Sequence, residues 1–288
     1  MENKMNFDEL KTKFTVNRSV RLDEYEEKKN YLISKDIDTV SETNNPKLIF
    51  AAGQPGAGKT ALIKRIKEDY PDEGFVVIDI DEYRTIHPDF EEIKQYRNDV
   101  IVFTNSFLFD MEEDIILAAT SQRKNIIYVG TLRDTDFALN FIVKHAKEKG
   151  YQIQIYAMAV NQIESLISTQ ERYEKQLDTN APVVHFIDFN FHQLATSGYE
   201  TTLALFEKEK IYDVIKVVVR GEKDGDLPQF TETYAPVIEC IQKNRGNIVS
   251  KDVFYERLNK LLNKRELRNS SEREIQVIKD ILKYLEEL

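Results

Sequence analysis

The stretch from Gly53 to Thr60, GQPGAGKT, constrains the fold of this chain more than any other part of it. It follows the pattern G-x-x-x-x-G-K-[ST], a glycine-rich loop whose backbone N–H groups bind phosphate. Such a loop needs a buried strand before it and a helix after it. Here the apolar run KLIFAAG (Lys47–Gly53) precedes the loop, and the helically spaced TALIKRIKEDY continues from its last residue. The sequence therefore predicts a nucleotide-binding loop between a strand and a helix.

The residues of this loop have distinct parts in holding a nucleotide. Backbone N–H groups and the positive end of the following helix would surround the β-phosphate. Lys59 would reach the β- and γ-phosphates, and the Thr60 hydroxyl would ligate Mg²⁺. The alternative, a glycine turn without a ligand, is disfavoured by the flanking strand and helix. The predicted nucleotide-binding residues are Gly53, Gln54, Pro55, Gly56, Ala57, Gly58, Lys59 and Thr60, with ATP or GTP and Mg²⁺ as cofactors.

Four further apolar runs alternate with helical patterns along the chain. They are Phe75–Asp81, Asn125–Thr131, Tyr151–Val160 and Asp213–Gly221. This alternation predicts an α/β fold, a parallel sheet flanked by helices. We expect an N-terminal helical segment at residues 1–46, a P-loop kinase-like core with a lid at 47–221 and a C-terminal helical extension at 222–288. The extension starts in the linker-like stretch Gly221–Gln229 and contains only helical patterns after it.

Two expectations concern individual helices. One continuous helical stretch is predicted from about Asp89 to Thr120. Ser271 and Glu274 form a capping-box pattern for the last helix.

Composition narrows the kinds of partner. The 288 residues carry a formal net charge of -10 and include one cysteine, Cys240. An acidic chain repels phosphates, so we expect no nucleic-acid partner. A single cysteine excludes an internal disulfide and is typical of a reducing cytoplasm. No apolar run has membrane-spanning length and MENKMNFDELKTKF has no signal-peptide core, so we expect a cytoplasmic protein without a membrane partner.

The end of the second predicted strand indicates the class of reaction. It carries Asp79 and Asp81, which share one face because strand side chains alternate. The third strand, IIYVGT, lacks the carboxylate with which P-loop ATPases organise Mg²⁺. A carboxylate at the carboxyl end of a parallel strand, beside the γ-phosphate, can take the proton of an attacking hydroxyl. The pattern favours a small-molecule kinase; the alternative is that the two carboxylates cap the next helix.

Four stretches in the same order resemble the zeta toxins, P-loop kinases of bacterial toxin–antitoxin systems. The stretches are GQPGAGKT, VVIDIDEYRTIHPDF, NIIYVGTLRDTD and YAMAVNQIESLISTQERYE, and the resemblance spans about residues 47–221. Its specific part is Asp81 followed by His87 and Pro88, together with GT.R and ERYE. The resemblance implies strand order 2-3-1-4-5 and ATP-dependent 3′-phosphorylation of UDP-N-acetylglucosamine, which stops peptidoglycan synthesis. It also implies a small helical, epsilon-like antitoxin that blocks the nucleotide site and bridges two toxin copies.

The resemblance implies three catalytic residues. Lys59 matches the phosphate lysine, and Asp81 matches the general base that takes the sugar hydroxyl proton. Arg172, in ERYE, matches a lid arginine that neutralises the transferring phosphate.

Substrate contacts are implied in the same way. Glu113, in DMEEDI, falls at the position of a substrate-binding glutamate on a helix, and Thr131 and Arg133 match the substrate-contacting GT.R turn. Arg84, three residues after Asp81, is either a substrate contact or a surface salt-bridge residue.

The chain departs from the family pattern at two positions. Val129 stands where the family has a glutamate before the Gly-Thr pair, and His185 aligns by spacing with a second basic lid residue that is usually Arg. Valine accepts no hydrogen bonds from a sugar, so we expect Val129→Glu to lower the KM for UDP-N-acetylglucosamine. A neutral imidazole has no charge and so cannot replace the positive charge of a guanidinium. His192 matches a family histidine and is interpreted as helix packing or capping.

These departures keep three interpretations open. The first is a toxin that phosphorylates a nucleotide sugar. The second is a P-loop kinase of another small molecule, such as an antibiotic or a metabolite. The third is a catalytically weakened nucleotide-binding protein that acts through a partner, against which intact Lys59, Thr60, Asp81 and Arg172 argue.

Overall fold

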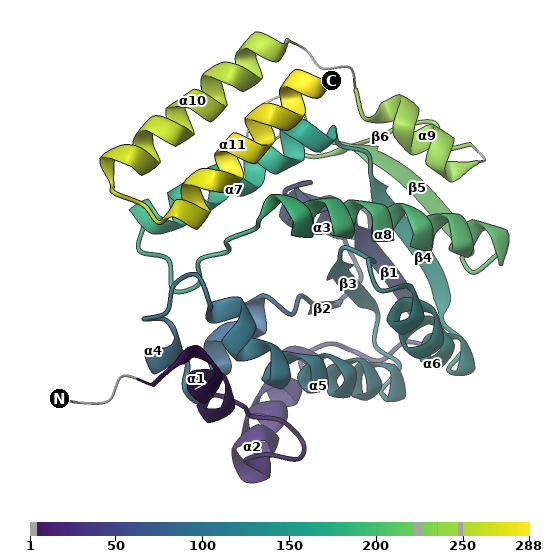
Figure 1. Cartoon of the computed structure of the whole chain (residues 1–288). Helices are drawn as coiled ribbons and strands as arrows, with labels where there is room; N and C mark the ends of the chain where they lie inside the picture. Colours follow the sequence, from purple (N-terminus) through teal and green to yellow (C-terminus); the bar gives the residue numbers. More distant parts are fainter. Residues whose placement is uncertain (1–4, 222–225, 235, 247–249) are drawn as a thin grey trace.

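A single twisted sheet lies at the centre of the protein (Figure 1). The computed structural model describes residues 5–221, 226–234, 236–246 and 250–288. Its strands are β1 (Lys47–Ala52), β2 (Val76–Ile78), β3 (Ile126–Gly130), β4 (Gln152–Met158), β5 (Val214–Val219) and β6 (Gln229–Phe230). Their order is β2-β3-β1-β4-β5-β6, and β1 to β5 are parallel. The α/β fold and the order 2-3-1-4-5 are thereby confirmed.

An unpredicted antiparallel strand extends one edge of this sheet. In β6, Phe230 pairs with Val218 and Gln229 with Val219. Residues 222–225 of the linker-like stretch lie outside the described residues, and its last residue, Gln229, begins β6. The expectation of helices alone after the linker was therefore wrong, because two residues are too short a run to show strand periodicity.

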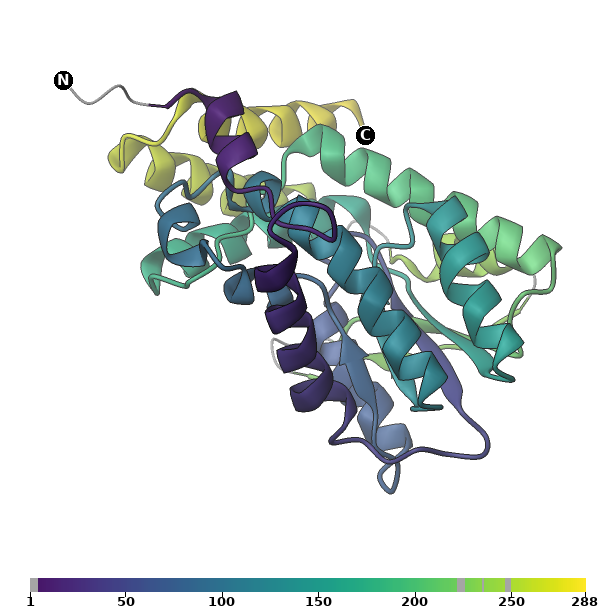
Figure 2. The same ribbon diagram turned by 90° about the horizontal axis from the view of Figure 1, so that it is seen from below.

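The helices form layers on both faces of the sheet (Figure 2). They are α1 (Phe7–Lys13), α2 (Leu22–Leu32), α3 (Lys59–Asp69), α4 (Phe90–Ile93), α5 (Val100–Ser121), α6 (Lys144–Glu148), α7 (Gln162–Asp178), α8 (Phe189–Lys208), α9 (Val237–Asn244), α10 (Lys251–Leu267) and α11 (Glu272–Glu287). Short helical turns of other pitch are η1 (Ile33–Ile37), η2 (Glu82–Ile86) and η3 (Phe137–Val143). Helix α3 packs on one face through Leu62 and Ile66, and α5, α6 and α8 pack on the other. Both faces are buried, which explains the continuous apolar runs of the strands.

The helical stretch predicted from Asp89 to Thr120 is two helices. Helix α4 ends at Ile93, and α5 begins at Val100 after a turn. Within the turn, the Asp99 N–H donates to the Tyr96 carbonyl at 2.8 Å. The Asn98 side chain accepts a hydrogen bond of 2.9 Å from the Tyr173 hydroxyl. A contact from a distant helix thus fixes a break that the local pattern did not reveal.

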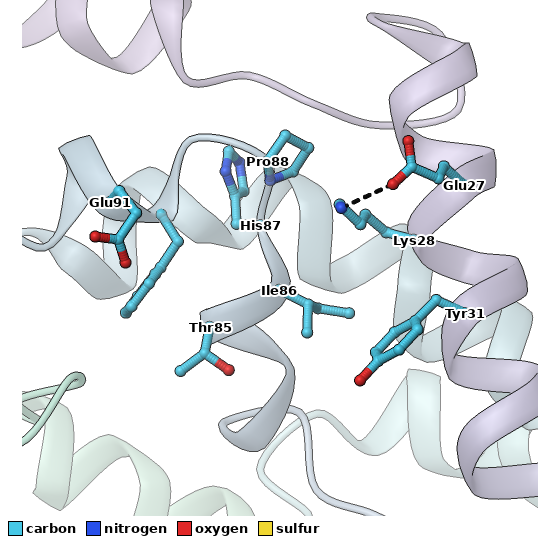
Figure 3. A pocket seen from close by; sticks show the side chains of 9 residues that line it. Glu27, Lys28, Tyr31, Thr85, Ile86, His87, Pro88 and Glu91 are labelled. Atoms are coloured by element: carbon cyan, nitrogen blue, oxygen red, sulfur yellow. Dashed lines mark hydrogen bonds and ion pairs between the residues drawn. The ribbon is translucent and has the colours of Figure 1, made fainter.

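The N-terminal segment is anchored on the turn that follows η2. His87 accepts the Asp89 N–H at Nδ1 and lies 3.0 Å from the Phe14 carbonyl through Nε2, so its proton is on Nε2. Burial lowers the pKa of His87 to about 4 and keeps the ring neutral. A cavity of about 380 Å³ separates α2 from this turn and is lined by side chains such as Tyr31 and Pro88 (Figure 3). Neither the phosphate loop nor Asp81 lines it, so this cavity is distinct from the predicted site.

The C-terminal helices pack on α7. Apolar side chains of α7, α10 and α11 form one buried cluster, in which Leu166, Leu258 and Ile281 are completely covered. The predicted capping box at the start of α11 is confirmed, because Ser271 N–H donates to Glu274 and Glu274 N–H donates back to Ser271. Cys240 is a buried residue of α9. Across the described ranges, we find no helix with the length and apolar character needed to cross a bilayer.

Candidate active site

The phosphate loop turns tightly between β1 and α3. Gly56 and Gly58 have φ angles of +76° and +96°, in the left-handed region that favours glycine. A Cβ atom on Gly56 would lie 2.1 Å from the carbonyl oxygen of Ser165, so α7 packs directly on the loop. Gly58 is the N-cap of α3, which places the helix N-terminus at the loop. This geometry is that of a phosphate cradle.

Lys59 lies across the loop that it follows. Its ammonium donates to the carbonyls of Gly53 at 2.9 Å and Gln54 at 3.3 Å. Burial lowers the pKa of Lys59 to about 8, and the nearby Asp79 carboxylate opposes that shift. The lysine is therefore positioned at the cradle, beside a carboxylate at the end of β2.

A divalent cation at this site would need oxygen ligands from a nucleotide as well as from the protein. Thr60 is exposed in the first turn of α3, and the charge of Asp79, just after β2, acts on Lys59 more strongly than that of Asp81. No cluster of three His, Cys, Asp or Glu side chains within the described ranges could hold a metal by itself. Thr60 together with phosphate oxygens fits the mode in which Mg²⁺ is held in nucleotide sites.

Asp79 and Asp81 lie after β2, which ends at Ile78, so the prediction that both are strand residues sharing one face was wrong. Asp81 directly precedes η2, and the two carboxylates have different surroundings. Burial raises the pKa of Asp79 to about 6, and the charge of Asp81 adds to the shift. Burial also opposes ionisation of Asp81, but contacts with His185 and Arg84 outweigh it and hold the Asp81 pKa far below its usual range. The Asp81 side chain is 42 % exposed and makes no capping bond to η2. Asp81 is thus an ionised carboxylate open to a ligand, and Asp79 accepts the Asp81 N–H at 3.2 Å.

Arg84 is a buried partner of Asp81 and not a surface residue. Its Nε donates to Asp81 Oδ1 at 2.9 Å, and its Nη1 donates to the Thr104 hydroxyl of α5 at 2.6 Å. Only 4 % of the residue is exposed. Of the two alternatives, a salt bridge at the surface is wrong, because the ion pair with Asp81 is buried on the Arg84 side and the guanidinium also bonds to α5. A substrate contact by Arg84 stays a prediction.

Arg172 and His185 approach the same region from α7 and from the segment before α8. Arg172 is exposed on α7, and its charge contributes to the lowered pKa of Lys59. His185 is buried, with Nε2 3.5 Å from Asp81 Oδ2. His185 therefore lies at Asp81, and the charge of Arg172 acts on Lys59.

The turn after β3 is held against α8. Leu132 has a positive φ of 50°, and the Arg133 guanidinium lies 4.6 Å above the Phe191 ring. A Cβ atom on Gly198 would lie 2.5 Å from the Arg133 carbonyl oxygen, so α8 packs closely on this turn. Thr131 is partly exposed at the end of the sheet that carries Asp79 and Asp81.

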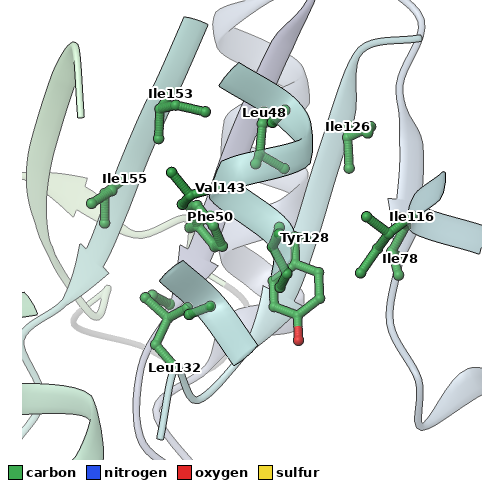
Figure 4. Packing of buried hydrophobic residues seen from close by; sticks show 14 of the residues in the cluster. Leu48, Phe50, Ile78, Ile116, Ile126, Tyr128, Leu132, Val143, Ile153 and Ile155 are labelled. Atoms are coloured by element: carbon green, nitrogen blue, oxygen red, sulfur yellow. The ribbon is translucent and has the colours of Figure 1, made fainter. Parts of the chain in front are cut away.

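Glu112, and not Glu113, faces the sheet. Glu113 lies on the other side of α5 and forms an ion pair of 2.8 Å with Arg18 of the N-terminal segment. Glu112 is buried and accepts a hydrogen bond of 2.7 Å from the Tyr128 hydroxyl, which Figure 4 shows among the apolar side chains of the core. Burial raises the pKa of Glu112 to about 7, and the charges of Asp81 and Asp79 add to the shift. The placement does not favour a substrate contact at Glu113.

Sequence reasoning missed two further residues of this region, Glu112 and Arg220. The helical spacing of Glu112 with the core residues Leu108 and Ile116 was the available signal. Arg220, just after β5, donates to the Gly56 carbonyl and to Glu164 Oε1 of α7. Nothing in the local sequence around Arg220 indicates that it supports the phosphate loop.

His192 also supports the loop. Its Nε2 lies 3.2 Å from the Pro55 carbonyl and 2.9 Å from the Ser165 hydroxyl. Burial lowers its pKa to about 4, so the ring is neutral. The predicted packing role extends to a direct contact with the cradle.

Val129 packs in the apolar cluster under α3, together with Ile49 and Leu62, and is 6 % exposed. The adjacent Tyr128 points to the opposite face, toward Glu112. Ile78 pairs with Tyr128, so Asp79 is close to Val129 along the neighbouring strand. A carboxylate at position 129 would be buried near another carboxylate.

We therefore expect Val129→Glu to lower the melting temperature, because it buries an unpaired charge. Thermal unfolding of Val129→Glu and of the uncharged Val129→Gln would measure this effect. The larger loss is expected for Glu, with a difference that grows as pH rises above the pKa of the carboxyl in the unfolded chain and levels off above its raised pKa in the folded protein. Equal stability of Val129→Glu and wild type would mean that a polar partner reaches position 129, and would restore the expectation of a lower KM.

The chain has detectable similarity to known proteins. The sequence pattern of the zeta toxin family matches residues 30–229. Toxin PezT of Streptococcus pneumoniae serotype 4 is 31 % identical over 232 residues, which are 77 % of this chain and 89 % of that protein. Toxin zeta of Streptococcus pyogenes is 29 % identical over 198 residues, 68 % of each chain.

Solved structures agree on the fold. A structure from the characterization of the PezAT chromosomal toxin–antitoxin system of Streptococcus pneumoniae superposes with a TM-score of 0.71 at 23 % identity, covering 83 % of this chain and 96 % of that one. The native complex of AvrRxo1-ORF1 with AvrRxo1-ORF2 superposes with a TM-score of 0.55 at 14 % identity, covering 92 % and 84 %.

The glycine-rich cradle at the end of β1 and the parallel sheet in the order β2-β3-β1-β4-β5 define a P-loop α/β protein. The family pattern extends beyond that loop over more than half of the sequence. The chain belongs to the zeta toxin family.

Proposed function

We propose that this protein is an ATP-dependent phosphotransferase that phosphorylates the sugar of UDP-N-acetylglucosamine at the 3′ position, and that it acts as the toxin of a toxin–antitoxin system. The observation that supports this proposal is that the charges of Asp79, Asp81 and Arg172 all act on Lys59, which lies at the phosphate loop. Family membership and relatives named as toxins support the biological role.

The cradle would hold the nucleotide phosphates. Backbone N–H groups of the loop would bind the β-phosphate together with the N-terminus of α3; Pro55 has no N–H, and those of Gly53 and Ala57 already donate to the carbonyls of Gly130 and Gln54. Lys59 would leave its loop carbonyls to contact the β- and γ-phosphates. When Mg²⁺ is bound, it neutralises phosphate charge, with the Thr60 hydroxyl as the protein ligand. An AvrRxo1 structure with ATP, of TM-score 0.52, is consistent with a nucleotide in this fold.

Transfer of the γ-phosphoryl group needs a side chain that accepts the hydroxyl proton and a cation beside the phosphoryl group. The sugar hydroxyl oxygen would form the new P–O bond while the bond from the γ-phosphorus to the ADP oxygen breaks, and Asp81 would take the hydroxyl proton. Arg172, exposed on α7, would close over the transferring phosphate and offset its charge. Asp81 suits this role because it is ionised and accessible.

The acceptor would lie between Asp81, the Thr131–Arg133 turn and α5. On α5 we assign the contact to Glu112, which faces the sheet, in place of Glu113, which pairs with Arg18. With a pKa near 7, Glu112 can be present in either protonation state and can donate or accept a hydrogen bond to a sugar hydroxyl or amide.

An antitoxin partner follows from the toxin role. The structural neighbours come from the PezAT toxin–antitoxin system and from a complex of AvrRxo1-ORF1 with AvrRxo1-ORF2. For this chain we infer a small helical, epsilon-like antitoxin that covers the nucleotide site and bridges two copies of the toxin in the cytoplasm. Phosphorylation of a different small molecule, such as an antibiotic or a metabolite, is the second candidate, because Val129 and His185 depart from the family pattern.

Induced expression of the wild-type chain and of Asp81→Asn, which lacks the proton acceptor, tests this function. We expect the wild-type chain to stop cell-wall growth when no antitoxin is present, and Asp81→Asn to be harmless because asparagine cannot accept the proton. The turnover of Asp81→Asn should fall by about 10², the low end for a general base, since a loose transition state needs little deprotonation.

The exposed neighbour Glu82 supplies the matched control, and Glu82→Gln should remain toxic at wild-type turnover. Growth arrest that persists with Asp81→Asn would show that the damage does not come from phosphoryl transfer.

A further inference from the structure

The contacts of His185 differ from those expected of a second lid cation. Its ring is 9 % exposed and lies between two side chains, Asp81 on one side and Gln176 on the other. Gln176 is in the last turns of α7, the helix that also carries Arg172. The ring nitrogens therefore connect the lid helix with the proposed base.

Gln176 determines which ring nitrogen carries the proton. The His185 backbone N–H donates to Gln176 Oε1 at 2.9 Å, which orients the amide oxygen toward the backbone. The amide nitrogen, Nε2, then faces His185 Nδ1 at 3.1 Å and can only donate. Nδ1 must accept this bond, so the neutral ring has its proton on Nε2, the nitrogen that faces Asp81 Oδ2 at 3.5 Å.

We propose that Gln176 and His185 form a positioning pair for Asp81, in which Gln176 holds the Nε2–H tautomer of His185 and this N–H stabilises and orients the Asp81 carboxylate. The role in phosphoryl transfer rests on the function proposed above. Arg84 already donates to Oδ1, and His185 Nε2, which has no hydrogen-bond partner in this structure, would supply the donor to Oδ2. Each oxygen of Asp81 would then have one protein donor and keep a lone pair for a substrate hydroxyl. The present 3.5 Å separation is longer than a hydrogen bond, and we expect it to shorten when substrate binds.

The charges around Asp81 mean that loss of the His185 donor should change the pKa of Asp81. Arg84 from η2 and Lys59 from α3 favour its ionised form, whereas Asp79 from the end of β2 and Glu112 from α5 place negative charge nearby. Without the His185 donor, only Arg84 and Lys59 would offset the negative charges of Asp79 and Glu112 near Asp81. The pKa of Asp81 should then rise, and because the base must be ionised, the rate should begin to fall at a higher pH as the solution is acidified.

Substitution of His185 by a donor and by a non-donor tests the proposal. His185→Leu should lower kcat by about tenfold, because Asp81 is no longer held in the orientation from which it meets the hydroxyl, with the KM for the nucleotide unchanged. Its acidic limb in the pH–rate profile should move to higher pH. His185→Gln, whose amide nitrogen reaches the place of Nε2, should restore kcat and the position of the acidic limb. Gln176→Leu should have values between those of wild type and His185→Leu. His145→Leu, a histidine of α6 bonded to the Phe141 carbonyl, is the matched control and should match wild type.

Two spectroscopic measurements do not depend on turnover. Long-range ¹H–¹⁵N spectra should show His185 as the Nε2–H tautomer in wild type and as a tautomer mixture in Gln176→Leu, with the signal assigned by its loss in His185→Leu. The ¹³C titration of the Asp81 carboxyl should shift upward in His185→Leu and not in His145→Leu. If these shifts occur but no acceptor is phosphorylated, the pairing stands and the proposed function fails. An Nδ1–H tautomer in wild type, or a His185→Gln protein as impaired as His185→Leu, would overturn the positioning pair.

Discussion

Lys59→Ala should lower the rate of phosphoryl transfer by roughly 10²–10³, a cost of about 3–4 kcal/mol in the transition state, the size measured for loss of one oxyanion donor. The lysine lies at the cradle with its ammonium on the carbonyls of Gly53 and Gln54, from which it can turn to the β- and γ-phosphates. The charge developing on the transferring group would lose that partner, whereas the backbone N–H groups would still bind the nucleotide. We therefore expect kcat to fall more than nucleotide affinity.

Single-turnover transfer rates and nucleotide Kd values would measure the two effects separately. Lys67→Ala, on the exposed side of the same helix, is the matched control and should transfer phosphate at the wild-type rate. Undiminished transfer by Lys59→Ala would rule out the assignment of this loop as the phosphate cradle.

Arg265→Ala should lower the free energy of unfolding by about 3 kcal/mol, because removal of one partner from a buried ion pair leaves the other without compensation. Arg265 is completely buried in α10 and donates to Glu174 of α7 at 2.8 Å and to Gln170 at 2.9 Å. Glu174 is also buried but keeps a second partner, Arg268, at 2.6 Å. That remaining pair places the expected loss at the lower end of the 3–5 kcal/mol range for buried pairs.

Urea unfolding monitored by circular dichroism would measure this loss. Lys283 provides the control, since its pair with Glu287 is exposed and 4.0 Å long, and Lys283→Ala should change stability by less than about 1 kcal/mol. If Arg265→Ala were as stable as Lys283→Ala, the C-terminal helices would not be clamped to α7 by this pair. The clamp matters for the site because α7 carries Arg172 and Gln176.

Local sequence was sufficient for the parts of the site that have short-range signatures. The phosphate loop was recognisable because Gly56 and Gly58 adopt backbone angles that favour glycine, and Lys59 and Thr60 follow at fixed spacing. The five predicted strands were visible because both faces of the sheet are covered, which requires continuous apolar runs. Asp81 was predicted from the end of the apolar run Phe75–Asp81, although β2 itself ends at Ile78.

Long-range contacts were not predictable in the same way. The choice between Glu112 and Glu113 depends on the rotation of α5 about its axis, which is set by packing on the sheet and by Arg18 from the N-terminal segment. The burial of Arg84 depends on Thr104, which is distant in sequence. The pairing of Gln176 with His185 depends on how the segment before α8 folds back on α7.

The most direct test of the central claim is the fate of the γ-phosphate. Purified protein would be incubated with γ-labelled ATP, Mg²⁺ and a panel of acceptors, including UDP-N-acetylglucosamine, other UDP-sugars and aminoglycosides, and the products would be identified by mass spectrometry and ³¹P NMR. We predict label on the 3′ position of UDP-N-acetylglucosamine with wild type, and label that accumulates roughly 10²–10³ times more slowly with Lys59→Ala. Label found only in inorganic phosphate, or only on an acceptor that is not a nucleotide sugar, would contradict the account.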